Sequence, residues 1–301
     1  MMGAPLLRVS CIALAMPFAL LAAYGLQPLQ GEEVGKRLDR SKLELVFAEE
    51  FDEPISFYDV EHAPEGRWKT NFRHGVQDPA SPIAWQARTL VPNEELQYYG
   101  DPFRDANPFE WRPGELTIVA TRSEVGAPHG LPYLSGLITT ETSFEQTYGY
   151  FEARVTMPVG KGLWPAFWLI PGLVPQPEPG APQPIREVDV FENIGKDGEV
   201  YASVHREEDG RHITDNQRIP VDTVTEPHTY GVLVGRNTIT WYVDDVAVKE
   251  SPNVDFHKPA HMLLNLAVGG DWPGNPDATT RFPARMTIDW VRAYRLKGPA
   301  S

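Results

Sequence analysis

The sequence has almost no cysteine. Cys11 is the only one in 301 residues, and it lies inside an apolar N-terminal leader. Removal of the leader would leave no thiol, so neither a disulfide, a thiolate nucleophile nor a cysteine-bound metal is expected in the processed protein. An exported chain of this kind must rely on its hydrophobic core, and about 260 residues are enough to build one.

Basic residues are scarce relative to acidic ones. Lys and Arg number 27 against 41 Asp and Glu, which gives a formal net charge of −14. Nucleic-acid binding is therefore not expected, because affinity for nucleic acids rests on the neutralisation of phosphates by basic side chains. The acidic balance fits a soluble protein with a neutral or cation-decorated partner, and solubility alone explains it equally well.

Long apolar runs are absent outside residues 1–26. In that segment Arg8 precedes an apolar run that extends from Val9 to Leu26. The pattern predicts a secretory signal peptide that is cleaved, although an uncleaved membrane anchor is the alternative because the run approaches the length that spans a bilayer. We expect a secreted or periplasmic protein that has no stable membrane association after cleavage.

Turn-forming residues are abundant, with 25 Gly and 29 Pro. Apolar and polar residues alternate with a period of two in segments such as 116–121 and 151–157, and no long 3.6-residue period appears outside the leader. Many short strands over about 250 residues predict an all-β sandwich. Residues 27–42 are polar and are predicted to be a linker, and a single domain is expected over residues 43–297. The Pro-rich segment 171–184 predicts a stiff extended loop, which would either border a cleft or form an ordinary connection.

Three carboxylates alternate with apolar residues in the hexapeptide Glu-Val-Asp-Val-Phe-Glu, residues 187–192. Its Val and Phe residues favour a strand, in which Glu187 and Asp189 share one face. A regular strand would send Glu192 to the other face, but one extra residue near Val190 and Phe191, a β-bulge, would bring it back. Paired carboxylates with separated pKa values perform acid/base catalysis, so we suspect a catalytic site. A solvated acidic face and a calcium site are the alternatives.

The hexapeptide resembles the central motif of glycoside hydrolase family 16 in its bulged form, which is typical of bacterial laminarinases and related endoglycanases. The resemblance covers nearly all of the chain after the leader. It extends over further segments in family order, at residues 45–52, 93–99, 148–154, 162–168, 264–274 and 289–294.

The resemblance implies a β-jelly-roll sandwich of two antiparallel sheets with a concave substrate cleft. It also implies retaining hydrolysis, which uses two carboxyl groups about 5–5.5 Å apart. Glu187 would be the nucleophile and Glu192 the general acid/base. Asp189 between them would hydrogen-bond Glu187 and help to keep one carboxyl ionised and the other protonated.

Residues that bind the sugar are also implied by the resemblance. Trp164 would face the sugar, while Trp168 would lie either in the cleft or in the core, and Trp272 would border the rim. A tryptophan ring stacks on the apolar face of a pyranose. The remaining residues expected near the cleft are His205, Asn71, Glu95 and Gln97.

A structural calcium is the one metal that the resemblance suggests. Asp289 matches the position that binds calcium on the convex side in many members of the family, and a backbone carbonyl near Gly114 would complete the site. No cofactor is required for the expected chemistry, and nothing in the sequence demands an oligomer, so we expect a monomer.

Two departures from the laminarinase pattern bear on specificity. Leu137 and Tyr150 stand where many laminarinases carry Arg, and the change at Leu137 removes a planar donor group. Residues 107–109 and 146–152 are similar to those of bacterial glycanases that depolymerise exopolysaccharides of the succinoglycan type. The Leu137 and Tyr150 departures are therefore interpreted as markers of substrate specificity.

We expect a secreted retaining endo-β-glucanase that hydrolyses internal β-1,3 or mixed β-1,3/1,4 linkages. An endoglycanase for a succinoglycan-type exopolysaccharide is the alternative substrate class, and a transglycosylase would use the same covalent intermediate. A non-catalytic carbohydrate-binding protein is the alternative of another class. The presence of all three carboxylates favours an enzyme.

Overall fold

The structure is a computed structural model that describes residues 34–73, 77–78, 80–104, 106–123, 130–172 and 184–297. The predicted signal peptide and all but the ends of the Pro-rich segment lie outside these residues. Within them, no helix has the length and apolar character needed to cross a membrane.

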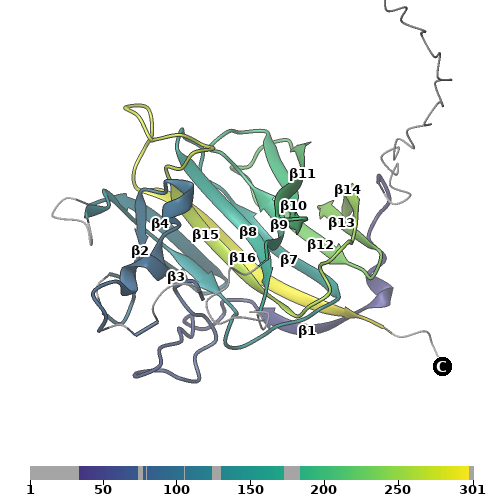
Figure 1. Ribbon diagram of the computed structural model, residues 1–301, viewed down its shortest axis with the longest axis horizontal. Helices are drawn as coiled ribbons and strands as arrows, with labels where there is room; N and C mark the ends of the chain where they lie inside the picture. Colours follow the sequence, from purple (N-terminus) through teal and green to yellow (C-terminus); the bar gives the residue numbers. More distant parts are fainter. Residues whose placement is uncertain are drawn as a thin grey trace, which may run out of the picture.

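Two β-sheets form the molecule (Figure 1), as the alternating pattern predicts. The outer sheet has the order β14-β13-β12-β7-β16-β4-β5-β2, with β1 added to β16 and β3 to β4. Its strands are β1 (Leu43–Glu49), β2 (Gln97–Tyr99), β3 (Phe109–Arg112), β4 (Glu115–Arg122), β5 (Tyr133–Ser135), β7 (Gly149–Thr156), β12 (His228–Val234), β13 (Thr238–Val243), β14 (Val246–Pro252) and β16 (Ala284–Leu296).

The inner sheet carries the acidic hexapeptide near its middle, in the order β11-β10-β9-β8-β15-β6. Its strands are β6 (Leu137–Thr139), β8 (Leu163–Pro171), β9 (Arg186–Glu192), β10 (Glu199–Glu208), β11 (Arg211–Pro220) and β15 (Ala260–Val268). Three short 3-10 helices, η1 (Arg40–Lys42), η2 (Ala84–Arg88) and η3 (Val91–Asn93), complete the described elements. Described strand pairs are antiparallel except β2 with β5.

The hydrophobic core fills the space between the sheets. Its residues alternate along the strands: Phe151, Ala153 and Val155 of β7 face Phe167 and other residues of the inner sheet within one cluster. The opposite faces of both sheets are free for other uses, because successive side chains of a strand point to opposite sides. The residues between the core positions of β8 and β9 therefore project from the far face of the inner sheet.

The packed domain starts before residue 43. The amide of Gly35 donates to the carbonyl of Ala247 at 2.8 Å. Arg40 donates to both carboxylate oxygens of the buried Glu152 at 3.0 and 2.7 Å and also pairs with Asp245. Residues 35–42, which were predicted to be part of a linker, thus pack against β14 and β7. The sequence of this segment is polar and does not predict that it packs on the domain. The contacts of Gly35 and Arg40 with the outer sheet show that it does.

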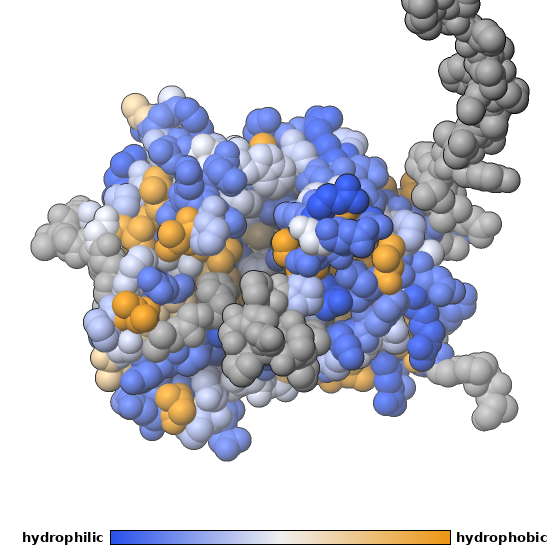
Figure 2. Space-filling view, viewed as in Figure 1, coloured by the Kyte–Doolittle hydropathy of each residue, from blue (hydrophilic) through white to orange (hydrophobic). Residues whose placement is uncertain are grey.

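The surface agrees with the acidic composition. Polar and charged side chains cover most of the face in Figure 2, and hydrophobic residues form small separate patches. A surface of this kind keeps a highly charged protein soluble.

Candidate active site

A β-bulge in β9 places the three carboxylates on one face, as the sequence predicts. Asp189 lies opposite Trp168 of β8, while Phe191 lies opposite the adjacent Phe167, so Val190 is the extra residue. The same shift appears against β10. Val190 and Phe191 are both in the core, and Glu192 returns to the face of Asp189.

The carboxylates line one cavity of about 470 Å³, which we call the acidic pocket. It extends across the inner sheet from β11 to β15 and is closed on one side by the segment that includes η3. Its lining residues are Leu90, Asn93, Glu95, Trp164, Ala166, Trp168, Ile170, Ile185, Glu187, Asp189, Glu192, His205, His212, Asn216, Asn265, Ala267 and Trp272. The inner sheet thus carries the cleft that the family resemblance implies.

Two of the three carboxylates have a specific polar neighbour. The indole Nε1 of Trp164 donates to Oε1 of Glu192 at 2.9 Å. His205 Nε2 lies 3.2 Å from Oδ2 of Asp189. The other ring nitrogen of His205 contacts Nε2 of His212 at 2.8 Å. His212 belongs to β11 and was not singled out in the sequence, because only strand pairing brings it beside His205.

Burial dominates the electrostatics of the pocket, and the charge of Lys249 opposes it only in part at Asp189. Burial and the charge of Asp189 together raise the pKa of Glu192 to about 8, although the Trp164 donor partly opposes them. Burial also raises the pKa of Asp189 to about 7 and that of Glu187 well above its usual value. The raised pKa values favour the exchange of protons within the set, which acid/base catalysis requires.

The opposite sheet supports the bulge from behind. Nε1 of the buried Trp241 in β13 donates to the backbone carbonyl of Asp189 at 2.7 Å. Nζ of Lys249 in β14 lies 4.5 Å from the Trp241 ring centroid and donates to the carbonyls of Ala202 and Asp215 at 3.0 and 2.6 Å. Sequence reasoning missed both residues, since each occupies an ordinary position in an alternating strand.

Glu95 and Gln97 have different places although they lie two residues apart. Glu95 lines the acidic pocket, and burial raises its pKa to about 7. Gln97 is fully buried: its Nε2 donates to Glu95 Oε2 at 2.6 Å, and its Oε1 accepts from the amide of Val268 at 2.7 Å. Gln97 therefore orients Glu95 and is not among the lining residues of the pocket.

The tryptophans divide between the wall and the rim. Trp168 lines the pocket and donates through Nε1 to Oδ1 of Asn265 at 2.8 Å, which resolves the choice between cleft and core in favour of the cleft wall. Trp272 stands edge-to-face against Trp164 and Tyr201, with ring centroids 5.8 and 4.8 Å apart. Asn265 and Tyr201 were not predicted from the sequence.

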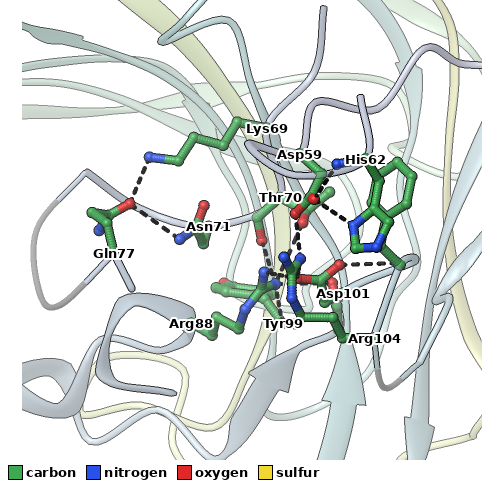
Figure 3. Close-up of polar contacts among 12 residues, drawn as sticks. Asp59, His62, Lys69, Thr70, Asn71, Gln77, Arg88, Tyr99, Asp101 and Arg104 are labelled. Carbon is green, nitrogen blue, oxygen red and sulfur yellow. Dashed lines mark hydrogen bonds and ion pairs between the residues drawn. The ribbon is translucent and has the colours of Figure 1, made fainter. Parts of the chain in front are cut away.

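Asn71 is not brought together with the carboxylates. It lies in a second cavity, where its side-chain amide donates to Oε1 of Gln77 at 3.2 Å, as Figure 3 shows. The segment that contains Asn71 extends the inner sheet beyond β6, because Lys69 and Thr139 exchange two backbone hydrogen bonds. The prediction that Asn71 binds sugar near the cleft stays a prediction.

Asp289 forms an ion pair with Arg154 at 2.8 Å on the outer sheet. Its neighbour Ile288 lies opposite Leu116, so Asp289 is near the β3–β4 turn that holds Gly114. In the described part of the chain, the side-chain clusters with metal-binding geometry are Asp59–Glu61–His62 and Glu187–Asp189–His205, and neither includes Asp289. A calcium ion at Asp289 and Gly114 stays a prediction.

Neither Leu137 nor Tyr150 lines the acidic pocket, and their interpretation as markers of substrate specificity stays a prediction. Leu137 is fully buried beneath Phe72 and Tyr99 and is not among the lining residues of the acidic pocket. Tyr150 lies in the outer sheet, packed edge-to-face against Tyr242. The alternation of β7 sends Tyr150 away from the core and hence to the side of the molecule that is remote from the pocket.

Two Glu and one Asp lie together on a bulged strand of a β-sandwich and line one pocket. This arrangement is typical of glycoside hydrolases. The chain belongs to glycosyl hydrolases family 16, whose family model matches residues 109–292.

Individual relatives agree with this assignment. The endo-1,3-1,4-beta-glycanase ExsH of Rhizobium meliloti is 37% identical over 278 residues, which cover 89% of this chain and 55% of that protein. The beta-glucanase of Rhodothermus marinus is 32% identical over 67% of this chain and 75% of its own length. The crystal structure of endo-beta-1,3-glucanase from Pyrococcus furiosus superposes with a TM-score of 0.68 at 31% identity, covering 89% of this chain and 99% of that one. The chain thus spans just over half the length of ExsH.

Proposed function

We propose that the protein is a retaining endo-β-glucanase that hydrolyses internal β-1,3 or mixed β-1,3/1,4 glucosidic linkages. The observation that carries the proposal is the bulge at Val190, which turns Glu187, Asp189 and Glu192 into one wall of an open pocket lined by tryptophans. A carbohydrate-binding protein needs aromatic rings but not this set of buried carboxyls with raised pKa values.

The roles of the carboxyls are those that the family resemblance implies. Glu192, whose pKa is raised and whose Oε1 accepts from Trp164, is the general acid that protonates the leaving oxygen and then the base that activates water. Glu187 attacks the anomeric carbon and forms the covalent glycosyl intermediate while the glycosidic C–O bond breaks. Asp189 shares a proton with Glu187, and Glu187 attacks as a carboxylate when Asp189 holds that proton.

Similarity supports the choice of glucan, since the names of the related proteins specify β-1,3 or mixed linkages. Tyr150 lies on the far side of the outer sheet, and Leu137 packs behind the pocket wall against Trp168 without lining the pocket, so neither residue distinguishes a succinoglycan-type exopolysaccharide from a plain glucan. That polymer, and transfer to a sugar in place of water, are therefore alternatives that the assay must separate.

Secretion and calcium belong to the same proposal. Polysaccharides are too large to enter a cell intact, and the leader at residues 1–26 has the composition of a signal peptide. Both points support export of the protein, which we take to be a monomer. N-terminal sequencing of the exported protein tests cleavage of the leader. Loss of thermal stability on chelation, abolished by Asp289→Asn, tests the calcium site.

Reducing-end release from laminarin, lichenan and a succinoglycan-type exopolysaccharide tests the activity. We expect release on a glucan that Glu187→Gln lowers by at least about 10³-fold, because the nucleophile is removed. Glu110→Gln on the exposed face of β3 is the matched control and should behave as the wild type. A folded protein with no release from any of these polymers would contradict the proposal.

Azide distinguishes the two glutamates. In Glu187→Ala the small anion can replace the missing nucleophile and should give an α-glycosyl azide from an activated β-glucoside. In Glu192→Ala the covalent intermediate still forms, so azide should give the β-glycosyl azide. The reverse pattern of anomers would exchange the assigned roles.

A further inference from the structure

A buried lysine lies behind the catalytic strand, between the two sheets. Lys249 belongs to β14 of the outer sheet, and its side chain is 2% exposed. It lies opposite Trp241 of β13, and both side chains reach the inner sheet. Lysine is almost never fully buried unless it is paired. The contacts of its ammonium group therefore indicate why this charge is kept inside the protein.

Both side chains bind backbone carbonyls at the bulge. Trp241 donates to the carbonyl of Asp189, where the register between β8 and β9 shifts. Nζ of Lys249 donates at 3.0 Å to the carbonyl of Ala202, which lies within the register shift between β10 and β9. A bulge disrupts the ladder of backbone hydrogen bonds, so carbonyls at a bulge need donors from elsewhere. The outer sheet supplies one neutral donor and one charged donor.

Asp215 of β11 offsets part of the lysine charge. Its carbonyl accepts from Nζ of Lys249 at 2.6 Å, and its carboxylate oxygen Oδ1 lies 3.4 Å from Nζ. This carboxylate is 46% exposed and also accepts a hydrogen bond from Ser251. Solvent and salt screen an exposed charge more strongly than a buried one. The ammonium group therefore keeps an electrostatic effect on the other groups that lie near it.

The groups that face this charge across the inner sheet are those of the acidic pocket. The titratable side chains on the pocket face of β9, β10 and β11 are Glu187, Asp189, Glu192, His205 and His212. Among them Asp189 responds to Lys249, because burial raises the pKa of Asp189 and the positive charge of Lys249 opposes that rise. The charges that act on Glu187 and Glu192 are those of the pocket itself.

The nucleophile needs one negative charge in the pair formed by Glu187 and Asp189. Burial by itself favours the protonated form of both carboxyls, and a protonated Glu187 cannot attack the anomeric carbon. The two groups share a proton and ionise as a unit, so a cation that stabilises a charge on Asp189 also favours ionisation of the pair. A cation placed behind the sheet does this without occupying the space that the sugar needs.

We propose that Lys249 is a positioning residue for the reaction, a fixed cation that keeps one negative charge in the Glu187–Asp189 pair. The carbonyls of Ala202 and Asp215 and the ring of Trp241 hold the ammonium group in place. The proposal rests on the proposed function for the step that the charge assists.

The first test is the pH profile of kcat/KM on the glucan that the wild type cleaves. Lys249→Gln keeps an N–H donor and removes the charge. The acid limb, which reports ionisation of the pair, should therefore move to higher pH by about 0.5–1 unit, less than the 1–3 units of a direct ion pair. The alkaline limb, which reports the proton on Glu192, should stay in place. Lys249→Arg restores the charge and should return the acid limb towards the wild-type position.

Lys69→Gln is the matched control for this profile. Lys69 is also a buried lysine, but it pairs with Glu141 at 2.8 Å in the second cavity. Its loss should leave the acid limb in place. A purely structural role of Lys249 would lower kcat at every pH without moving the acid limb. That result, or an acid limb that moves equally in both glutamine variants, would overturn the proposal.

The second test does not depend on activity. Folding raises the pKa of Asp189 from 3.8 to about 7, so stability is lost as the pH rises through this range. Without the cation the folded pKa is higher, and the loss continues to higher pH. The urea midpoint of Lys249→Gln should therefore fall further than that of the wild type between pH 6 and pH 8. Lys69→Gln measures the part that any buried lysine contributes through its own lowered pKa.

The coupling can also be measured without a substitution at Lys249, in case its variants do not fold. Coupling is reciprocal, so Asp189→Asn should lower the pKa of Lys249 by about 0.5 unit, followed by ¹⁵N NMR of the lysine ammonium groups. An unchanged pKa of Lys249, or urea midpoints that fall in parallel, would overturn the proposal. A wild type that is inactive on every glucan but shows both effects would instead refute the proposed function alone.

Discussion

The acidic pocket and the second cavity both bury carboxylates, but in the second cavity the buried Asp59 and Asp101 each pair with an arginine. Burial would raise the pKa of Asp59, yet hydrogen bonds from Arg104 and His62 outweigh it and hold that pKa below its usual range. In the acidic pocket burial raises the pKa of Glu192 to about 8, because its hydrogen-bond donor is a neutral indole. A lowered pKa indicates a carboxylate that stabilises the fold through an ion pair, whereas a raised pKa indicates a carboxyl suited to proton transfer.

The largest effect should come from removing the proton donor. Glu192→Gln is expected to lower kcat on laminarin by about 10²–10⁴-fold, the usual contribution of a general acid. The loss should shrink on an aryl glucoside whose leaving group needs no proton. An equal loss on both substrates, with Glu110→Gln active, would mean that Glu192 does not protonate the leaving group.

Breaking a pair in the second cavity should act on stability. The side chains of Arg88 and Asp101 are 11% and 6% exposed, so Asp101→Asn leaves a nearly buried guanidinium without its carboxylate. We expect a loss of about 3 kcal/mol in the free energy of unfolding, measured in urea at neutral pH. Removal of the exposed Glu110–Arg285 pair by Glu110→Gln should cost at most about 1 kcal/mol. Similar losses in the two variants would contradict the contrast between buried and exposed pairs.

The pH dependence of stability should have opposite signs in the two regions. The pKa of Glu192 is raised on folding, so its contribution to stability is complete below the unfolded pKa near 4.5 and is lost as the pH rises towards about 8. The pKa of Asp59 is lowered, so its contribution is present above the unfolded pKa near 3.8 and is lost as the pH falls further. Glu192→Gln should therefore be stabilised relative to the wild type by a few kcal/mol more at pH 8 than at pH 5.

Urea titrations of both proteins at the two pH values measure this difference. Asp59→Asn tests the opposite sign. The variant should be less stable than the wild type at pH 7, and the two proteins should have similar stability below pH 3. The difference in the free energy of unfolding between Glu192→Gln and the wild type should grow from pH 5 to pH 8. If it does not grow, Glu192 is already ionised in the folded protein at pH 5.

The smallest effect concerns the support behind the bulge. Trp241→Phe keeps an aromatic ring but removes the N–H that donates to the carbonyl of Asp189. We expect a loss of about 1–2 kcal/mol in stability, because a buried acceptor loses its donor, and a fall in kcat with KM unchanged. Tyr242→Phe, a buried ring on the other face of β13, is the control. Unchanged kcat would mean that the bulge holds its shape without the indole.

Local patterns predicted much of the site. Alternation of apolar and polar residues in β7 and β9 indicated a sandwich, and the odd spacing of Glu192 indicated the bulge that the register shows. These features depend on neighbours within a few residues, so a sequence displays them directly. The family resemblance added Trp164, Trp168, His205, Glu95 and Trp272, which all line the acidic pocket.

Other features arise between segments that are distant in the chain. Strand pairing and sheet stacking alone bring four residues to β9 or to its neighbours: His212, Trp241, Lys249 and Asn265. The same is true of Leu137 and Tyr150, whose position in the sequence does not say which face of which sheet they occupy.

By itself the sequence determined a β-sandwich, a bulged strand with three carboxyls on one face and the chemistry that such a set performs, because short-range periodicity and residue type decide these things. Only the tertiary structure decided which carboxylates are paired with cations and which are not. Burial and pairing set the pKa values of these groups, and both depend on which strands become neighbours.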